Sequence, residues 1–248
     1  MFNTYADVFA YRAGSYHSAM RRFPRARDAE FAAVVEPLAG LPNGRVCDLP
    51  SGGGYLAAYL PPGMRYVGID PAAAFIRAFD AEPALQRLRG SATEVPLDDG
   101  AVDHLISLAG LHHEPDLPRV FAEMRRVLKP GGRLVIADVG LDTAPGDFLN
   151  GFVARNNPDG HDGRFLGPDV TRQLETAGFR VVSDEMVQVP WTFASARDAG
   201  SFCGELFGLI GPSADEVAQA LEQVVGLQSD TNGVRVPWTL RRLVGEAR

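Results

Sequence analysis

Short apolar runs alternate with longer segments of helical periodicity through the middle of the chain. The runs predict β-strands near residues 45–49, 65–69, 102–108, 133–138 and 179–189, with helices that begin near Gly53, Ala72, Leu117 and Pro168. Strands that alternate with helices are typical of a parallel sheet joined by crossover helices. The pattern therefore predicts an α/β fold of the doubly wound type.

The helix expected over residues 117–128 has the clearest pattern. Its apolar residues recur at spacings of three and four: Leu117, Val120, Phe121, Met124, Val127 and Leu128. Pro118 lies in the first turn, and the sequence Lys-Pro-Gly-Gly at 129–132 follows the last. The nearly continuous apolar run at 133–137 is typical of a central strand that is buried on both faces.

The flanking segments complete the predicted organisation of one domain, 1–248. We expect an N-terminal helical cap at 1–40, a core at 41–193, a helical insertion at 194–233 and a final strand at 234–248. The insertion, helical over 195–228, lies between candidate strands at 179–193 and 234–241 and is predicted to form a lid over a site.

Two further segments stand out by composition. Residues 140–168 hold six glycines and three prolines, which is long for a plain connection and therefore predicts a functional segment. The sequence Val-Pro-Trp-Thr occurs at 189–192 and again at 236–239. We interpret this repeat as a coincidence between two strand ends that each dock a tryptophan; a shared place at a pocket rim is the alternative.

Composition and charge narrow the class of protein. The 248 residues are 46% hydrophobic and 22% charged with a net charge of −7, which predicts a globular domain and argues against nucleic acid as a partner. Cys47 and Cys203 lie far apart and predict neither a disulfide framework nor a zinc site. No signal peptide or run of about 20 apolar residues is visible, so we expect a cytoplasmic protein without a membrane partner.

A glycine-rich loop follows the first predicted strand. Backbone N–H groups in such a turn lie at the carboxyl edge of the sheet, where open α/β sheets bind ligands. The spacing Gly52-x-Gly54-x-x-Ala57 matches a dinucleotide fingerprint, and Asp70, which ends the next strand, suits a ribose. Asp70 also suits the cap of a helix that begins at Pro71, so this motif alone leaves the cofactor open.

Several segments together resemble the class I S-adenosylmethionine-dependent methyltransferases of the small-molecule type. They are Asp-Leu-Pro-Ser-Gly-Gly-Gly at 48–54, Val-Gly-Ile-Asp at 67–70, and the segments 90–97, 102–107, 111–113, 123–134 and 177–182. The resemblance covers about residues 45–190. It implies a Rossmann-like, mostly parallel seven-stranded sheet with an antiparallel last strand. It also implies S-adenosylmethionine as cofactor and S-adenosylhomocysteine as product.

The resemblance assigns cofactor contacts residue by residue. They are Asp48, Pro50, Ser51, Gly52, Gly54, Asp70, Pro71, Ser91, Ala92, Thr93 and Leu108. Pro50 stands where the family usually has glycine, and Ser91 stands where an acidic residue is frequent. Proline lacks an N–H but keeps a carbonyl that can accept from the cofactor's ammonium, and serine still offers a hydroxyl to adenine.

Three histidines are candidates for the chemistry. His112 and His113 follow the fourth predicted strand at the cofactor edge, and His161 lies in the loop after the fifth. Each is predicted as a general base or as a group that positions the acceptor. For the first pair the alternative is lining of the cofactor site, and for His161 it is an exposed loop. Asp159 and Asp162 are candidates to orient His161, whereas the acidic residues nearby lack metal-ligand spacing, so we expect no metal.

Aromatic residues outside the core suggest where an acceptor is held. Tyr11 and Tyr16 of the cap and Phe202 and Phe207 of the insertion are predicted substrate contacts, with helix packing or core burial as the alternative.

We therefore expect methyl transfer to a small metabolite, with oxygen preferred over nitrogen or carbon as acceptor atom. A cyclase, lyase or binding protein that uses the same cofactor without methylation is the alternative that Pro50 and Ser91 suggest. An NAD-dependent oxidoreductase is less favoured, because the chain lacks a Tyr-x-x-x-Lys pair. A homodimer is left open.

Overall fold

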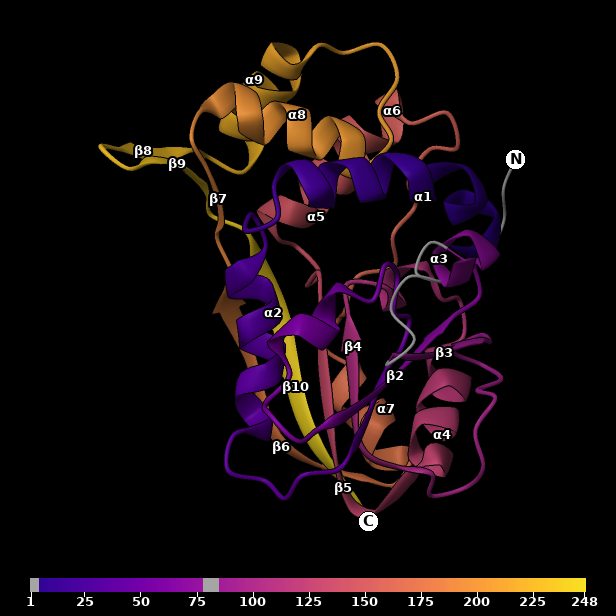
Figure 1. Cartoon of the computed structure of the whole chain (residues 1–248). Helices are drawn as coiled ribbons and strands as arrows, with labels where there is room; N and C mark the ends of the chain where they lie inside the picture. Colours follow the sequence, from indigo (N-terminus) through magenta and orange to yellow (C-terminus); the bar gives the residue numbers. More distant parts are fainter. Residues whose placement is uncertain (1–4, 78–84) are drawn as a thin grey trace.

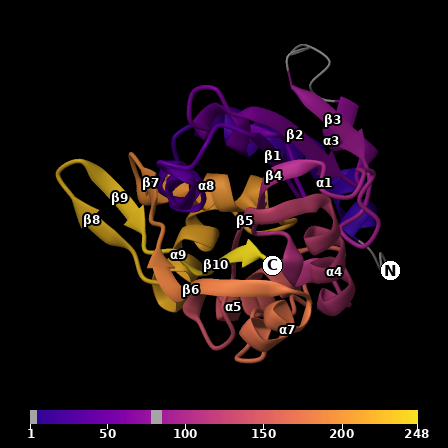
Figure 2. The ribbon, with the colours of Figure 1, turned by 90° about the horizontal axis from the view of Figure 1, so that it is seen from below.

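A seven-stranded sheet forms the centre of the molecule. The computed structural model describes residues 5–77 and 85–248. The strands are β1 (Arg45–Asp48), β2 (Arg65–Asp70), β3 (Gln86–Arg89), β4 (Val102–Leu108), β5 (Leu128–Asp138), β6 (Phe179–Gln188) and β10 (Thr239–Ala247). Their order is β3-β2-β1-β4-β5-β10-β6, and β10 is antiparallel to both neighbours. The predicted Rossmann-like sheet with an antiparallel last strand is confirmed (Figures 1 and 2).

Alternating residues of the central strands face two separate apolar cores. On β1, Val46 faces the core of α2 (Asp28–Val35), and Cys47 faces the core of α4 (Leu117–Val127) and α7 (Val170–Thr176). Ile106 and Leu105 of β4 divide in the same way. This period of two places helices on both faces of the sheet, as a doubly wound fold requires.

Helices from both ends of the chain cover the upper edge of the sheet. They are α1 (Tyr5–Arg22), α8 (Ala196–Leu206) and α9 (Ala214–Val224). Figure 1 shows α1 lying across the carboxyl ends of the strands, with α8 directly above it. The short α3 (Ala73–Arg77) follows β2 and packs on α1. The expected cap and insertion therefore form one continuous cover.

A second, three-stranded sheet extends from the main one. It contains β7 (Trp191–Phe193), β8 (Gln228–Asp230) and β9 (Gly233–Val236) in the order β7-β9-β8. The expected strands at 179–193 and 234–241 are thus each split in two, and the expected final strand at 234–248 is divided between two sheets. The breaks fall at Pro190 and Pro237, because proline cannot donate a hydrogen bond to a strand partner.

Other elements also differ from expectation. The helix expected near Gly53 is only a 3-10 helix, η2 (Tyr55–Tyr59), and β5 begins five residues before the expected 133. Strand β3 was not predicted from the sequence. It lies at the edge of the sheet and its residues are mostly polar, so it has no apolar run that would indicate a strand.

The segment 140–168 is not a plain loop. It contains α5 (Ala144–Phe148), a π-helix (Leu149–Val153) and α6 (Ala154–Asn156) in succession. The Thr143 hydroxyl accepts from Gly146 N at the start of this helix, and Pro145 lies in its first turn.

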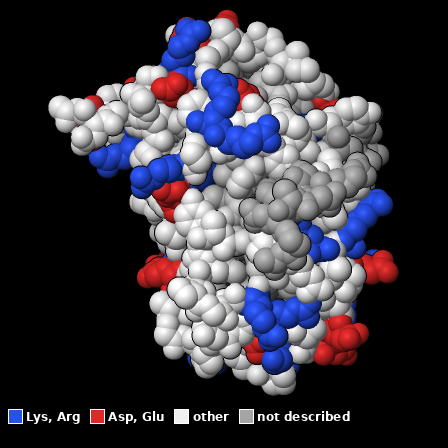
Figure 3. All heavy atoms as spheres, in the orientation of Figure 1, with Lys and Arg blue, Asp and Glu red and all other residues white. Residues whose placement is uncertain are grey.

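Charged side chains are scattered over the face of the molecule that Figure 3 shows. On the side shown in Figure 3, lysine and arginine form separate groups, several of them beside acidic residues. Within residues 5–77 and 85–248, none of the helices has the length and apolar character that crossing a bilayer demands.

Candidate active site

A cavity lies between the carboxyl ends of β1, β4 and β5 and the cover formed by α1 and α8. Its free volume is about 100 Å³. One side, which we call the loop wall, contains Asp48, Pro50, Ser51, Gly52 and Leu108. The opposite side, which we call the tryptophan wall, contains Glu30, Phe31, Trp191, Phe207 and Trp238. Three histidines, His112, His113 and His161, also line the cavity.

The loop wall is a tight backbone turn that Asp70 holds in place. Gly52 and Gly54 have φ angles of 50° and 71°, which favour glycine. The fully buried Asp70 accepts hydrogen bonds from Gly52 N at 2.8 Å and from Ala72 N at 2.8 Å. It therefore joins the loop to the segment before α3, which begins at Ala73 and not at the expected Pro71. Its contact with a ribose stays a prediction.

Pro50 fits into a space that a glycine leaves open. The peptide bond between Leu49 and Pro50 is cis. A Cβ at Gly110 would lie 2.3 Å from Pro50 Cγ, so a side chain at 110 cannot coexist with the proline ring. The proline that departs from the family pattern is therefore matched by a glycine at the end of β4.

Asp48 is an acidic group in a dry environment. It is 3% exposed, and Tyr66 Oη donates to its Oδ2 at 2.9 Å. Burial raises the pKa of Asp48 to about 7, Asp70 adds to this rise and the Tyr66 hydrogen bond opposes it. A cation entering the cavity beside Asp48 would favour its charged form.

The predicted cofactor residues divide into two groups. Asp48, Pro50, Ser51, Gly52 and Leu108 line the cavity. Six others, Gly54, Asp70, Pro71, Ser91, Ala92 and Thr93, lie outside its lining. Around Ala92 the chain forms a local turn, with Ser91 Oγ 3.2 Å from Thr93 Oγ1.

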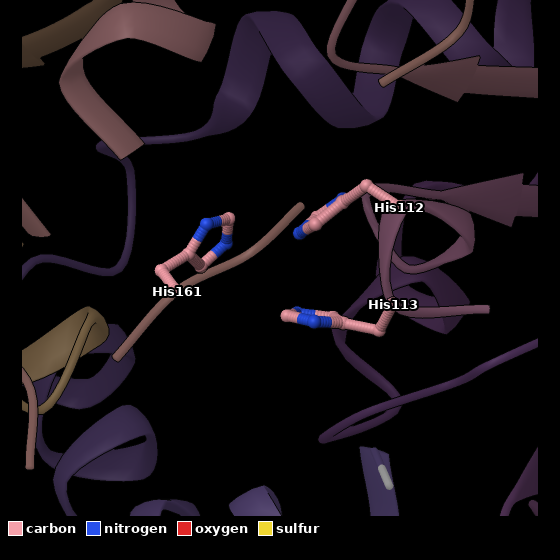
Figure 4. Close-up of side chains that lie close together, drawn as sticks. All are labelled: His112, His113 and His161. Carbon is pink, nitrogen blue, oxygen red and sulfur yellow. The ribbon is translucent and has the colours of Figure 1, made fainter. Parts of the chain in front are cut away.

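The three histidines converge from two segments that are far apart in the sequence. His112 and His113 lie in the 3-10 helix η3 (Leu111–His113) after β4, whereas His161 lies beyond α6. The ring centroids are 4.1 Å apart for His112 and His113, 5.5 Å for His112 and His161, and 5.4 Å for His113 and His161. Figure 4 shows the rings pointing toward one another. One ring nitrogen of each lies within 4.8 Å of the other two, so the cluster has the ligand atoms to hold a metal ion.

Asp138 fixes the ring of His112. This fully buried residue ends β5, and its Oδ1 lies 2.6 Å from His112 Nδ1. Its Oδ2 accepts from Leu111 N at 2.7 Å, which also holds the backbone of η3. With Nδ1 directed to the carboxyl group, Nε2 is the ring nitrogen of His112 that remains for the cavity.

Asn150 fixes the ring of His161. Its side-chain oxygen lies 2.7 Å from His161 Nδ1 and also accepts from Gly163 N, while its amide nitrogen donates to Gly163 O. These bonds fix the amide orientation, so Nδ1 of His161 donates and Nε2 remains for the cluster. The orienting residue is therefore Asn150 of the π-helix, not the expected Asp159 or Asp162.

Burial keeps two of the histidine rings neutral. Desolvation, together with nearby His112 and Arg12, lowers the pKa of His161 to about 3. Desolvation also lowers the pKa of His113 well below its usual value, with His112, His161 and Arg12 acting in the same direction. Neutral imidazole is the form that accepts a proton or binds a metal ion.

The tryptophan wall is built from the repeated Val-Pro-Trp-Thr sequence. Trp191 and Trp238 stack with centroids 4.3 Å apart and an interplanar angle of 17°. The breaks at Pro190 and Pro237 bring the two rings together, because each precedes a tryptophan where the chain passes between the sheets. Both tryptophans line the cavity, as the alternative of a shared place at a pocket rim predicts.

A buried ion pair supports this wall. Glu30 accepts from Trp191 Nε1 at 2.9 Å and from Arg27 Nε and Nη2 at 2.5 Å and 2.9 Å. Arg27 Nη1 also donates to Tyr16 Oη at 2.8 Å. The side chains of Arg27 and Glu30 are only 6% and 1% exposed, so this ion pair is shielded from water.

The predicted substrate residues lie in different places. Tyr16 and Phe207 line the cavity. Tyr11 is 72% exposed outside it, and Phe202 is fully buried behind Trp191. Sequence reasoning missed Glu30, for which its spacing from Arg27 was the available signal. Trp191 and Trp238 were predicted at the pocket only in the alternative for the repeat.

Known proteins resemble this chain in sequence and in fold. Residues 47–136 match the family model of a methyltransferase domain. An uncharacterized protein from a transposon of Streptomyces fradiae is 29% identical over 81% of this chain and 55% of its own length. An uncharacterized methyltransferase of Mycobacterium bovis is 35% identical over 48% of this chain and 50% of its own length. The chain thus spans about half the length of these curated relatives.

Solved structures share the fold at low sequence identity. A chain of the complex between the Haloferax volcanii Trm112 methyltransferase activator and its putative methyltransferase has a TM-score of 0.66 at 21% identity, covering 98% of this chain and 96% of that one. The cyclase SpnF has a TM-score of 0.57 at 20% identity, covering 88% and 79%. The matched domain at 47–136 contains the glycine loop and the β4 edge described above. Residues 47–136 thus match a methyltransferase domain in sequence, and the chain as a whole shares its fold with these solved structures.

Proposed function

We propose that the protein transfers a methyl group from S-adenosylmethionine to a small, planar oxygen acceptor held in the cavity. The observation that carries this proposal is that the glycine loop of the methyltransferase domain and three histidines open onto the same cavity. The cofactor supplies an activated methyl group on a sulfonium, and the protein contributes mainly by positioning the acceptor.

The loop wall fits the methionine part of the cofactor. Asp48, the carbonyl of Pro50 and the backbone of Gly52 offer negative or accepting groups to an ammonium. Asp70, Pro71 and Ser91–Thr93 remain the proposed contacts of the adenosine part. Ligand pockets usually measure about 300–1,000 Å³. Since the cavity has only about 100 Å³, it must widen when ligands enter.

The histidines fit the removal of a proton from an acceptor hydroxyl. His112, whose Nε2 remains for the cavity while Asp138 holds Nδ1, can take the proton as the oxygen attacks the methyl carbon, and solvent receives it later. Asp138 and Asn150 hold the rings of His112 and His161, so the base is oriented before the acceptor arrives.

The tryptophan wall favours a flat acceptor. Trp191, Trp238 and Phe31 present aromatic surfaces to the cavity, and Arg12 adds a positive charge beside the histidines. We therefore propose aromatic or conjugated hydroxyl compounds as the acceptor class, with those carrying a negative charge bound most tightly.

Calorimetry with S-adenosylhomocysteine tests the cofactor site. In Gly52→Val, added methyl groups enter the cavity beside Tyr16, and we expect at least about a tenfold loss of affinity. The matched control is Gly211→Val, which also replaces a glycine of positive φ but at a position without neighbours within 4 Å. Equal affinity in both variants would contradict the site.

A labelled-methyl assay over phenols, enols and amines tests the reaction. Transfer to a hydroxyl group supports the proposal. Tight binding of S-adenosylhomocysteine without transfer to any compound would favour a non-methylating use of the same fold. Tight binding of NAD without binding of the sulfur ligand would exclude the proposal.

A further inference from the structure

We propose that His112, His113 and His161 bind one divalent first-row transition-metal ion at the acceptor end of the cavity. The three histidines come from two segments almost 50 residues apart, so no local spacing in the sequence predicts a metal site. His161 follows the helical segment 144–156, and its ring lies beside those of His112 and His113, which follow β4 (Figure 4).

The distances allow one ion to reach all three rings. A ring nitrogen binds zinc at about 2.0–2.1 Å, so two ligands of one ion lie at most about 4.2 Å apart. The three candidate nitrogens already lie within 4.8 Å of one another. Small rotations of the rings close the difference without movement of the backbone.

The groups behind the rings match those found around metal-bound histidines. Such a histidine directs its second nitrogen to a carboxylate or carbonyl, which fixes the tautomer and the ring. Asp138 does this for His112 and Asn150 does it for His161, at 2.6 Å and 2.7 Å. A general base needs only one oriented histidine. Two oriented rings that converge with a third indicate that the three rings bind one ion together.

The donor atoms select the kind of metal. Three imidazole nitrogens, without a carboxylate or thiolate in the cluster, suit Zn²⁺, Co²⁺, Ni²⁺ or Fe²⁺ and do not suit Mg²⁺ or Ca²⁺. Three protein ligands also leave a coordination position that faces the cavity, as in catalytic rather than structural sites.

The charges around the cluster indicate what fills that position. Asp138 lies behind His112, and Arg12 adds positive charge near His113 and His161. Arg12 disfavours a second cation but favours an anionic oxygen bridging the ion and the guanidinium. This step rests on the proposed methyl transfer but replaces the histidine base: with all three rings bound to the ion, the ion would bind the acceptor oxygen, lower the pKa of its hydroxyl and let the proton pass to water.

Metal titration without cofactor tests the site directly. Protein stripped with a chelator is titrated with Zn²⁺ alone by calorimetry and with Co²⁺ by visible absorption. We expect one ion per chain. His161→Ala removes a ligand and should lose more than about a hundredfold in affinity, while Asn150→Ala should lose about 10–100-fold, as for other outer partners.

His104→Gln is the matched control, because this histidine lies within β4 with its ring beside Pro42 O. It should bind the metal as the wild type does. Circular dichroism and binding of S-adenosylhomocysteine establish that each variant is folded, and His161→Gln replaces His161→Ala if the latter does not fold. Equal zinc affinity in the wild type and a folded His161 variant would overturn the proposal, as would a folded wild type that takes up no metal.

The two proposals fail separately. Stoichiometric metal binding without methyl transfer would leave the metal site standing and remove the proposed function. Methyl transfer that persists at full rate in the chelator-stripped protein, with no metal uptake, would retain the function and remove the metal site.

Discussion

The two walls of the cavity are built in different ways. Apart from Leu108, the loop wall comes from one short segment, residues 48–52, and the hydrogen bond that holds it joins Gly52 to Asp70, only 18 residues away. The tryptophan wall consists of side chains, and its hydrogen bond between Glu30 and Trp191 joins residues 161 positions apart. We therefore expect added side-chain volume to disturb the loop wall most, and the loss of a hydrogen-bond partner to disturb the tryptophan wall most.

The largest expected effect breaks the tryptophan wall. Glu30→Ala leaves the guanidinium of Arg27 buried without its carboxylate and Trp191 Nε1 without its acceptor. We expect the free energy of unfolding to fall by about 3–5 kcal/mol, measured by urea denaturation. Arg197→Ala, which breaks an ion pair whose side chains are 70% and 66% exposed, is the control and should cost no more than about 1 kcal/mol. Similar losses in both variants would show that the buried pair does not support the wall.

The next effect concerns the loop wall and depends on pH. Since the pKa of Asp48 rises from 3.8 to about 7 on folding, the native state holds a proton that the unfolded state has lost in this range. The stabilisation is complete below pH 3.8 and is lost as the pH rises through 7. As the pH rises from about 4 through 7, the free energy of unfolding of the wild type should fall by up to about 4 kcal/mol relative to that of Asp48→Asn. Urea denaturation of both proteins at several pH values measures it, and parallel pH profiles would refute the assignment to Asp48.

A steric change sharpens the comparison further. Gly110→Ala places a methyl group 2.3 Å from Pro50 Cγ, so we expect a loss of about 1–3 kcal/mol in stability together with weaker binding of S-adenosylhomocysteine. Gly14→Ala adds the same methyl group to an exposed position of α1 with nothing within 4 Å, and should stabilise by about 0.5–1 kcal/mol. If Gly110→Ala behaves as this control does, the loop wall is not packed against β4.

The smallest expected effect measures the tryptophan stack. A double-mutant cycle of Trp191→Phe and Trp238→Phe should give a coupling energy of about 0.5–1.5 kcal/mol beyond the lost area. Trp238→Phe combined with Phe121→Leu, in the core on the other face of the sheet, should be additive within about 0.5 kcal/mol. Thermal unfolding of the six proteins decides whether the stacked pair is coupled.

The same contrast explains what could be read from the sequence. Strands β1, β2, β4 and β6 and helix α4 follow from local periodicity, and the cavity-lining residues from Asp48 to Gly52 follow from a continuous motif. The stack of Trp191 on Trp238 depends on two chain breaks whose pairing no local pattern encodes. The contact between Asn150 and His161 was also missed. Segment 140–168 has the composition of a loop, although it contains a helix that begins after the capping residue Thr143.

The π-helix at Leu149–Val153 has an evolutionary consequence. Such a segment corresponds to one residue inserted into an ordinary α-helix. Deleting that residue turns the two halves of the helix by about 100° relative to each other, because each residue of an α-helix advances by that angle. Asn150 would then leave His161 while the sheet and its cores stay intact. A single deletion in this helix would therefore keep the fold while it removes the contact between Asn150 and His161, so the presence of the π-helix can be compared between proteins with and without the three histidines.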